Sequence, residues 1–269
     1  MTHKKIGRCI WATLAVLGTR GWASAPQAFA AALDFKFSQE IPEDTYKKIV
    51  QPIVEPLRFT FVQPAAPTGT AGFELGVAAT GVPVPDEAKE LATRFLEDGS
   101  DFPSYLAIPR IVAQKGLPFG IDFAANFAMI PNSEIILAGG AVQWALLDGR
   151  VPLPALALRA GYNQLFGTEA LSVQVTNVEA LLSYGVPPGL NVLNPYAGGG
   201  IFWVDAQSKY SLEALDPGVP TQFAAKAQWD DLYGLVGLQI APFPFVRVAA
   251  EMQASKTQKL YSAKLSLGF

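Results

Sequence analysis

A strict alternation of side chains in the last eleven residues constrains the fold of this 269-residue chain most strongly. One face, apolar after its first residue, carries Lys259, Tyr261, Ala263, Leu265, Leu267 and Phe269. The other face is mostly small or polar and carries Leu260, Ser262, Lys264, Ser266 and Gly268. A period of two is typical of a β-strand, and a strand that is apolar on one side only suits a wall between lipid and water.

The same two-faced pattern recurs from residue 71 onward and predicts ten strands separated by turn sequences. The strand at 105–114 is interrupted by Pro109, and its facing is open. In the strand that starts at Leu171, Gln174 falls on the polar face, and a parity shift near Asn177 suggests a bulge. The predicted strands are 71–82, 105–114, 119–129, 135–147, 154–166, 171–184, 195–205, 232–240, 246–253 and 259–269.

These strands predict an all-β fold, an antiparallel transmembrane β-barrel of about ten strands with a short N-terminal helix. Only 16% of the residues are charged, and the longest uncharged run, 180–204, is broken by prolines and glycines. A membrane chain without long apolar helices must close its strands into a barrel, because lipid leaves no backbone polar group a partner. A twelve-strand barrel that adds strands at 57–62 and 33–37 is the alternative, and a secreted soluble β-sandwich is a third interpretation.

Residues 1–30 are typical of a signal peptide, with a basic start, an apolar core and small residues before Ala30. Cleavage there would remove His3 and Cys9, the single histidine and the single cysteine of the chain. It would also take four of the 20 basic residues and none of the 23 acidic ones, which leaves a net charge of −7. That balance argues against a nucleic-acid partner, and the loss of imidazole and thiol argues against an enzyme.

Residues 31–70 form a separate N-terminal segment ahead of the barrel, which spans 71–269. Pro42, Glu43 and Asp44 followed by apolar residues at helical spacing predict a short helix. Because ten strands bring both chain ends to the periplasmic side, we expect this helix in the periplasm or in the barrel mouth as a plug. The same topology makes the 83–103 connection, with a helix over 86–98, and the 207–230 connection extracellular.

Three motifs resemble known outer-membrane proteins. The terminal Phe269 behind alternating apolar residues resembles the C-terminal signature of bacterial outer-membrane β-barrels. The sequence Pro195-Tyr196-Ala197-Gly198-Gly199-Gly200 resembles the PYxGxG strand of small outer-membrane barrels. Pro109-Arg110 with the downstream sequence 115–120 resembles an uncharacterised family of Gram-negative outer-membrane barrels with N-terminal helical segments.

This resemblance covers most of residues 42–269 and implies a location in the outer membrane. It implies that the barrel-assembly machinery reads the last strand, and it brings no catalytic residues. The expected assembly signal consists of Tyr261, Leu265, Leu267 and Phe269.

The polar faces of the strands define a candidate lumen. They include Gln174 and Gln253, and the lumen or pore candidates are Glu74, Asp122, Asn126, Arg159, Asn163, Arg247, Glu251 and Lys264. These charges fit an ion-pair network that fills the interior, a pore or solute site, or a catalytic carboxylate pair, in falling order. We expect Glu251 and Lys264 to pair across the final hairpin.

The sequence therefore predicts a narrow channel or a transporter of a small or lipidic solute, or a structural membrane protein. The alternative is a surface-binding barrel that acts through its long extracellular loops. The expected partners are outer-membrane lipid, the assembly machinery and a small or lipidic solute, with no cofactor and no metal. Tyrosine and tryptophan near the strand ends are expected in interfacial girdles: Tyr105, Trp144, Tyr162, Tyr184, Tyr196, Trp203 and Tyr233.

Overall fold

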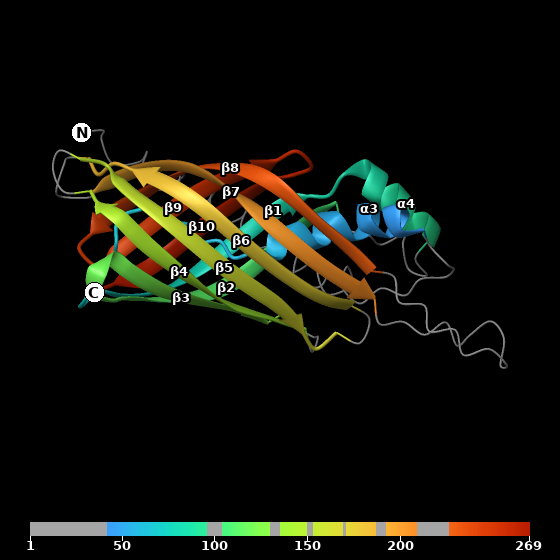
Figure 1. Ribbon diagram of the computed structural model, residues 1–269, viewed down its shortest axis with the longest axis horizontal. Helices are drawn as coiled ribbons and strands as arrows, with labels where there is room; N and C mark the ends of the chain where they lie inside the picture. Colours follow the sequence, from blue (N-terminus) through green and yellow to red (C-terminus); the bar gives the residue numbers. More distant parts are fainter. Residues whose placement is uncertain are drawn as a thin grey trace, which may run out of the picture.

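The computed structural model describes residues 42–95, 104–129, 135–149, 153–168, 171–186, 192–208 and 226–269. It shows a closed barrel of ten antiparallel strands (Figure 1). The strands are β1 (Phe73–Pro83), β2 (Tyr105–Gly116), β3 (Ile121–Met129), β4 (Ile136–Asp148), β5 (Ala155–Phe166), β6 (Leu171–Ser183), β7 (Leu193–Ser208), β8 (Lys226–Phe243), β9 (Val246–Ser255) and β10 (Lys259–Gly268). The predicted ten-strand barrel is confirmed.

The barrel closes between its first and last strands. β1 and β10 pair over eight positions, from Glu74 opposite Gly268 to Gly81 opposite Tyr261. Just below, Phe73 and Phe269 exchange both backbone hydrogen bonds, with N–O distances of 3.0 and 2.8 Å. Closure satisfies the polar edge that an open sheet would expose to lipid, which rules out the soluble sandwich.

Two expectations about the strands were wrong. β2 runs through Pro109 without a break, since Pro109 stays in register opposite Ala79. β6 pairs with both neighbours without a register shift, so no bulge lies near Asn177. The irregularities lie instead between Ala145 and Leu147 of β4 and between Ile240 and Phe243 of β8.

The N-terminal segment begins with helix α3 (Glu43–Val54) and a short 3-10 turn, η1 (Glu55–Leu57). A second helix, α4 (Asp86–Phe95), follows β1, and a 3-10 turn, η3 (Pro118–Gly120), precedes β3. Residues 57–62 lie outside the sheet, which excludes this strand of the twelve-strand alternative; the other, 33–37, lies outside the described residues. Within the described ranges, no helix is long and apolar enough to cross a membrane.

The helix α3 lies at the end of the barrel away from the C-terminus, next to α4 (Figure 1). We call this the helix end and the opposite one the Phe269 end. Short turns such as β8–β9 join strands at the Phe269 end, and the long 84–104 and 209–225 connections join them at the helix end. Short periplasmic turns and long extracellular loops are the rule for such barrels. The expectation of a periplasmic helix was therefore wrong, because the segment runs through the barrel before it enters β1.

The outer surface of the barrel is apolar around its middle and polar at the helix end of β6, β7 and β8. One row across these strands, Val178, Ile201 and Leu232, is apolar. Two rows nearer the helix end are polar: Gln174, Asp205 and Gln228, then Ser172, Gln207 and Lys226. Trp203, between them, is 44% exposed, as in an interfacial aromatic girdle.

The inward face reverses this pattern along the barrel axis. In β6, Leu171, Val173 and Val175 point inward at the helix end, and Gln174 points outward. The placement of Gln174 in the lumen was wrong because α3 fills that level with apolar side chains, while the outer face there has left the apolar belt. Tyr196 and Tyr233 were also misplaced, since both are buried inside the barrel; the other five predicted girdle residues are exposed.

Candidate functional site

The N-terminal segment runs down the lumen from the helix end to the Phe269 end. We call residues 43–68 the plug segment. At the helix end, Thr257 of the β9–β10 turn donates through Oγ1 to the Glu55 carboxylate, at 3.0 and 3.2 Å. At the other end, the Thr68 amide lies 3.1 Å from both carboxylate oxygens of Asp122. The plug segment therefore passes through the barrel once, in one direction.

The helix-end half of the lumen is an apolar core built around α3. The plug segment buries Tyr46, Ile49, Val50, Ile53, Val54 and Leu57 completely. The wall contributes Val82, Leu106, Ile108, Val173, Val175, Phe202, Val204 and Trp229 to the same cluster. Full burial of one such side chain stabilises by roughly 1.5–3 kcal/mol, so this packing anchors the helix in the barrel mouth.

Past Leu57 the plug segment forms neither helix nor strand, and side chains of the wall satisfy its backbone. Arg110 donates through Nη1 to the Arg58 carbonyl at 3.0 Å and through Nη2 to the Pro56 carbonyl. Asn163 donates to the Leu57 carbonyl at 2.6 Å. Buried carbonyls need donors, and here the wall provides them.

Further down, the wall continues to bind the backbone. Arg159 donates through Nη2 to the carbonyls of Gln63 and Pro64, at 2.8 and 2.7 Å. The Ala65 amide donates to Ser183 Oγ at 3.1 Å, and Gln143 Nε2 lies 3.4 Å from the Ala65 carbonyl. These contacts hold an extended chain in place without a strand ladder.

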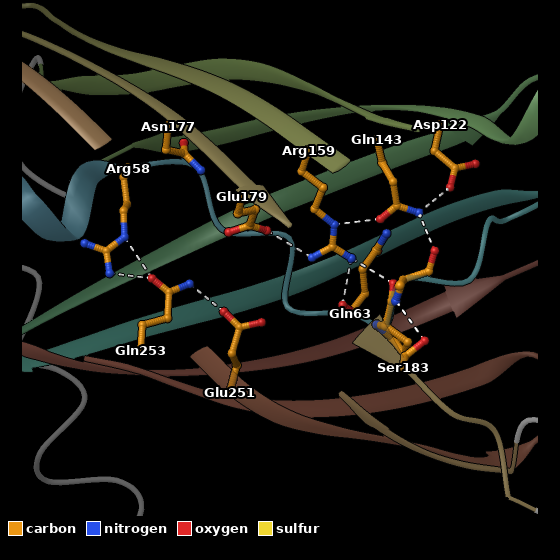
Figure 2. Close-up of polar contacts among 12 residues, drawn as sticks. Arg58, Gln63, Asp122, Gln143, Arg159, Asn177, Glu179, Ser183, Glu251 and Gln253 are labelled. Carbon is orange, nitrogen blue, oxygen red and sulfur yellow. Dashed lines mark hydrogen bonds and ion pairs between the residues drawn. The ribbon is translucent and has the colours of Figure 1, made fainter. Parts of the chain in front are cut away.

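Arg159 is the centre of a buried polar network in the wall (Figure 2). Its Nη1 lies 3.1 Å from Glu179 Oε1, and its Nε donates to Gln143 Oε1 at 2.6 Å. Gln143 in turn donates to Asp122 Oδ2 at 3.0 Å, and Tyr233 donates to Glu179 Oε2 at 2.7 Å. The ion pair has partners on both sides, as a buried charge requires.

Arg58 is a fully buried cation supplied by the plug segment itself. It donates through Nε and Nη2 to Gln253 Oε1 at 2.8 and 2.5 Å, and Gln253 donates to Glu251 at 2.5 Å (Figure 2). Its guanidinium carbon lies 4.5 Å from the ring centroid of Tyr233 and 5.0 Å from that of Phe202. Aromatic faces and an amide therefore stabilise this charge.

A second charged cluster lies nearer the Phe269 end. Lys264 Nζ lies 2.8 Å from Glu74 Oε1, and Arg247 Nη1 lies 2.6 Å from Glu74 Oε2. Lys264 also donates to Gln63 Oε1 of the plug segment at 3.0 Å. The expected pairing of Lys264 with Glu251 was wrong, because Lys264 points to β1 across the closing seam, and Glu251 bonds Gln253.

The eight predicted lumen residues all point into the barrel. Seven are buried, and Arg247, at the mouth, is partly exposed. Asn126 has no hydrogen-bond partner for its amide among the described residues. Their role in a pore or solute site remains a prediction. So does the assembly role of Tyr261, Leu265, Leu267 and Phe269, which all lie on the outer face.

Several lumen residues were missed from the sequence. Arg110 was missed because Pro109 left the facing of β2 open, and Glu179 because a parity shift was expected at Asn177. Arg58 was missed because its segment was not assigned. A strict alternation carried through both strands would have found Arg110 and Glu179.

A cavity of about 530 Å³ opens beside the plug segment at the Phe269 end. Gln63 and Thr68 line it on the plug side, and Glu74, Gln239 and Arg247 line it on the wall side. In the described ranges, no group of three or more His, Cys, Asp or Glu side chains could hold a metal ion.

Comparison with solved structures finds the N-terminal β-barrel domain of OprF from Pseudomonas aeruginosa. The identity is 12% over 75% of this chain and 99% of that chain, with a TM-score of 0.36. Ail, the attachment invasion locus protein of Yersinia pestis, shows 11% identity over 74% and 97%, with a TM-score of 0.36. The outer membrane protein OprG from Pseudomonas aeruginosa shows 10% identity over 77% and 99%, with a TM-score of 0.30.

No protein-family model and no curated protein matches the sequence. The structural similarities are too distant to transfer binding or transport to this chain. Its class follows from the chain's own geometry: an even-stranded, closed antiparallel barrel with an apolar outer belt, short turns at one end and long connections at the other. That is the architecture of bacterial outer-membrane β-barrels, and the protein is of this class.

Proposed function

We propose that this barrel is closed in its resting state and has a structural or surface-binding role. The plug segment carries this proposal, because Arg58, Phe59 and Phe61 occupy the middle of the lumen at no more than 2% exposure. An open pore would leave its lining wet, whereas here wall side chains bond the plug backbone. We do not include catalysis in the proposal.

The helix end is where such a barrel would meet a partner. It carries α3 and α4, joined by a Lys48–Glu87 ion pair of 2.9 Å, and the two long connections 84–104 and 209–225 begin and end there. Exposed helices and loops on a rigid barrel are typical of binding surfaces.

Planar-bilayer recording of two proteins tests the closed state. The intact protein should give no conductance steps, and a variant that lacks residues 43–68 should give them, with folding of both checked by heat-dependent gel mobility. Steady conductance by the intact protein would contradict the proposal. For the surface role, shortening both long connections should abolish cell-surface binding while leaving the barrel folded.

A gated transporter of a small or lipidic solute is the second candidate. The cavity at the Phe269 end favours it, because it reaches the plug segment at Gln63 and Thr68 and is lined by the charged residues Glu74 and Arg247. Solute uptake into vesicles by the intact protein, reduced when the plug is cross-linked to the wall, would support this candidate over the first.

A further inference from the structure

The route of the plug segment has a direction. Contacts with the wall follow the sequence in order, from Glu55 beside Thr257 at the helix end to Thr68 beside Asp122 at the Phe269 end. The chain then turns into β1, where Phe73 pairs with Phe269. Pro42 therefore lies at one mouth of the barrel and the start of β1 at the other.

In the outer membrane, the Phe269 end faces the periplasm, because it carries the short turns and both ends of the barrel sheet. A signal peptide delivers the start of the chain to that same compartment. The part of the chain around α3 thus begins in the periplasm and ends at the outer mouth of the barrel. The lumen of the same barrel connects the two places.

We propose that the barrel passes its own N-terminal segment outward through its lumen and presents the chain ahead of Pro42 at the cell surface. The substrate of this step is an unfolded polypeptide, the protein's own N-terminal segment. The step goes beyond the proposed resting state and does not depend on whether the barrel conducts ions.

The lumen wall is suited to a polypeptide because it binds backbone more than side chains. Arg110, Asn163, Arg159 and Gln143 contact six carbonyls of the segment, those of residues 56–58 and 63–65. Every residue has a carbonyl, so such a lining can accept successive stretches of chain as they pass.

Room for side chains is also built in at the narrow level. A Cβ added to Gly161 would lie 2.7 Å from the Phe59 Cβ, so the absence of a side chain there admits the Phe59 ring. At the outer mouth, the buried apolar face of α3 and the Lys48–Glu87 pair hold the segment once it has arrived. These contacts stop the movement and close the barrel.

Two cysteine variants of the same segment test the direction. In a Cys9→Ser background, Glu43→Cys places an exposed thiol at the helix end, and Thr70→Cys places one at the Phe269 end. Whole cells are treated with a membrane-impermeant maleimide, with and without permeabilisation of the outer membrane. Glu43→Cys should react fully in intact cells, and Thr70→Cys should show only the background of the cysteine-free protein until permeabilisation.

Labelling of Glu43→Cys only after permeabilisation would overturn the proposal, as would labelling of Thr70→Cys in intact cells. The route is tested by inserting a small, fast-folding domain between residues 41 and 42, matched with a variant of that domain that cannot fold. Passage through the lumen predicts that only the unfolded insert reaches antibody on intact cells. Equal display of both inserts, or display of neither, would contradict transit of an unfolded chain through the barrel.

Discussion

Arg159 and Glu179 lie directly opposite each other on β5 and β6, with Nη1 and Oε1 3.1 Å apart and both side chains closed off inside the barrel. The same guanidinium holds the carbonyls of Gln63 and Pro64. One arginine thus joins two strands of the wall to the plug segment. The barrel and the segment inside it share their polar contacts, so we expect them to unfold together.

Replacing Arg159 with methionine should therefore destabilise the protein by about 3–5 kcal/mol, because it leaves Glu179 buried without its cation. Urea unfolding of the protein in lipid vesicles measures the change. The double variant Arg159→Met/Glu179→Gln should lose clearly less than the sum of the two single variants. Arg247→Met, at the partly exposed mouth, is the control and should cost less. Equal costs for Arg159→Met and Arg247→Met would argue against the central role of the Arg159 pair.

Gly161 should tolerate no side chain. Its added Cβ would lie 2.7 Å from the Phe59 Cβ and 2.8 Å from Asn177 Oδ1, so Gly161→Ala should cost about 1–3 kcal/mol through overpacking. Gly140→Ala on the neighbouring strand is the matched control, since its Cβ would meet only the Ala124 carbonyl, at 3.6 Å. Combining Gly161→Ala with Phe59→Ala should relieve the clash; an unchanged penalty would place Phe59 elsewhere.

The pH dependence of stability should include a contribution from Glu55 at the outer mouth. Burial raises the pKa of this carboxyl above 4.5; the hydrogen bonds from Gln51 and Thr257 and the charge of Arg58 oppose the shift, and Asp231 adds to it. The folded protein therefore holds this proton more tightly than the unfolded chain does. The stabilising contribution is present below the unfolded pKa and is lost as pH rises through the folded one.

Glu55→Gln should accordingly raise the unfolding midpoint at neutral pH and flatten its dependence on pH in the acidic range. Denaturant midpoints of both proteins measured across that range provide the test. A larger gain at acidic than at neutral pH would show the opposite sign and a carboxyl that is stabilised as an anion.

The level at which the barrel leaves the membrane can be located on the outward face of β8. Val236, on its apolar stretch, should lie in lipid, so Val236→Lys should cost roughly 2–4 kcal/mol. Gln228→Lys, nearer the helix end, should be close to neutral. Unfolding from lipid vesicles compares the two variants, and equal costs would mean that the polar rows also lie in the hydrocarbon.

The barrel was predictable from the sequence because lipid and lumen impose opposite polarity on alternate residues, as in β3 and β10. The rule failed where those environments change. In β6 the helix α3 makes the lumen apolar and the outer face has left the lipid, so Gln174 points outward. The partner of Lys264 was missed because Glu74 is far away in the sequence and comes close only when β1 meets β10.

The path of the plug segment was beyond a local pattern for a similar reason. The helix α3 was predicted from Pro42 and the acidic first turn, and its apolar face showed that it needed a partner. Nothing in that face states which mouth of the barrel supplies the partner. The answer lies in dispersed wall residues such as Arg110 and Asn163, each of which contacts backbone and leaves no motif.

Hydrogen exchange of the Ala65 amide tests most directly whether the plug segment fills the lumen. This amide is buried and donates to Ser183 Oγ at 3.1 Å. In the folded protein in lipid nanodiscs, it should exchange about as slowly as amides of the barrel strands, and faster in Ser183→Ala. Exchange of Ala65 in the intact protein at the rate of an unstructured peptide would contradict a plugged lumen.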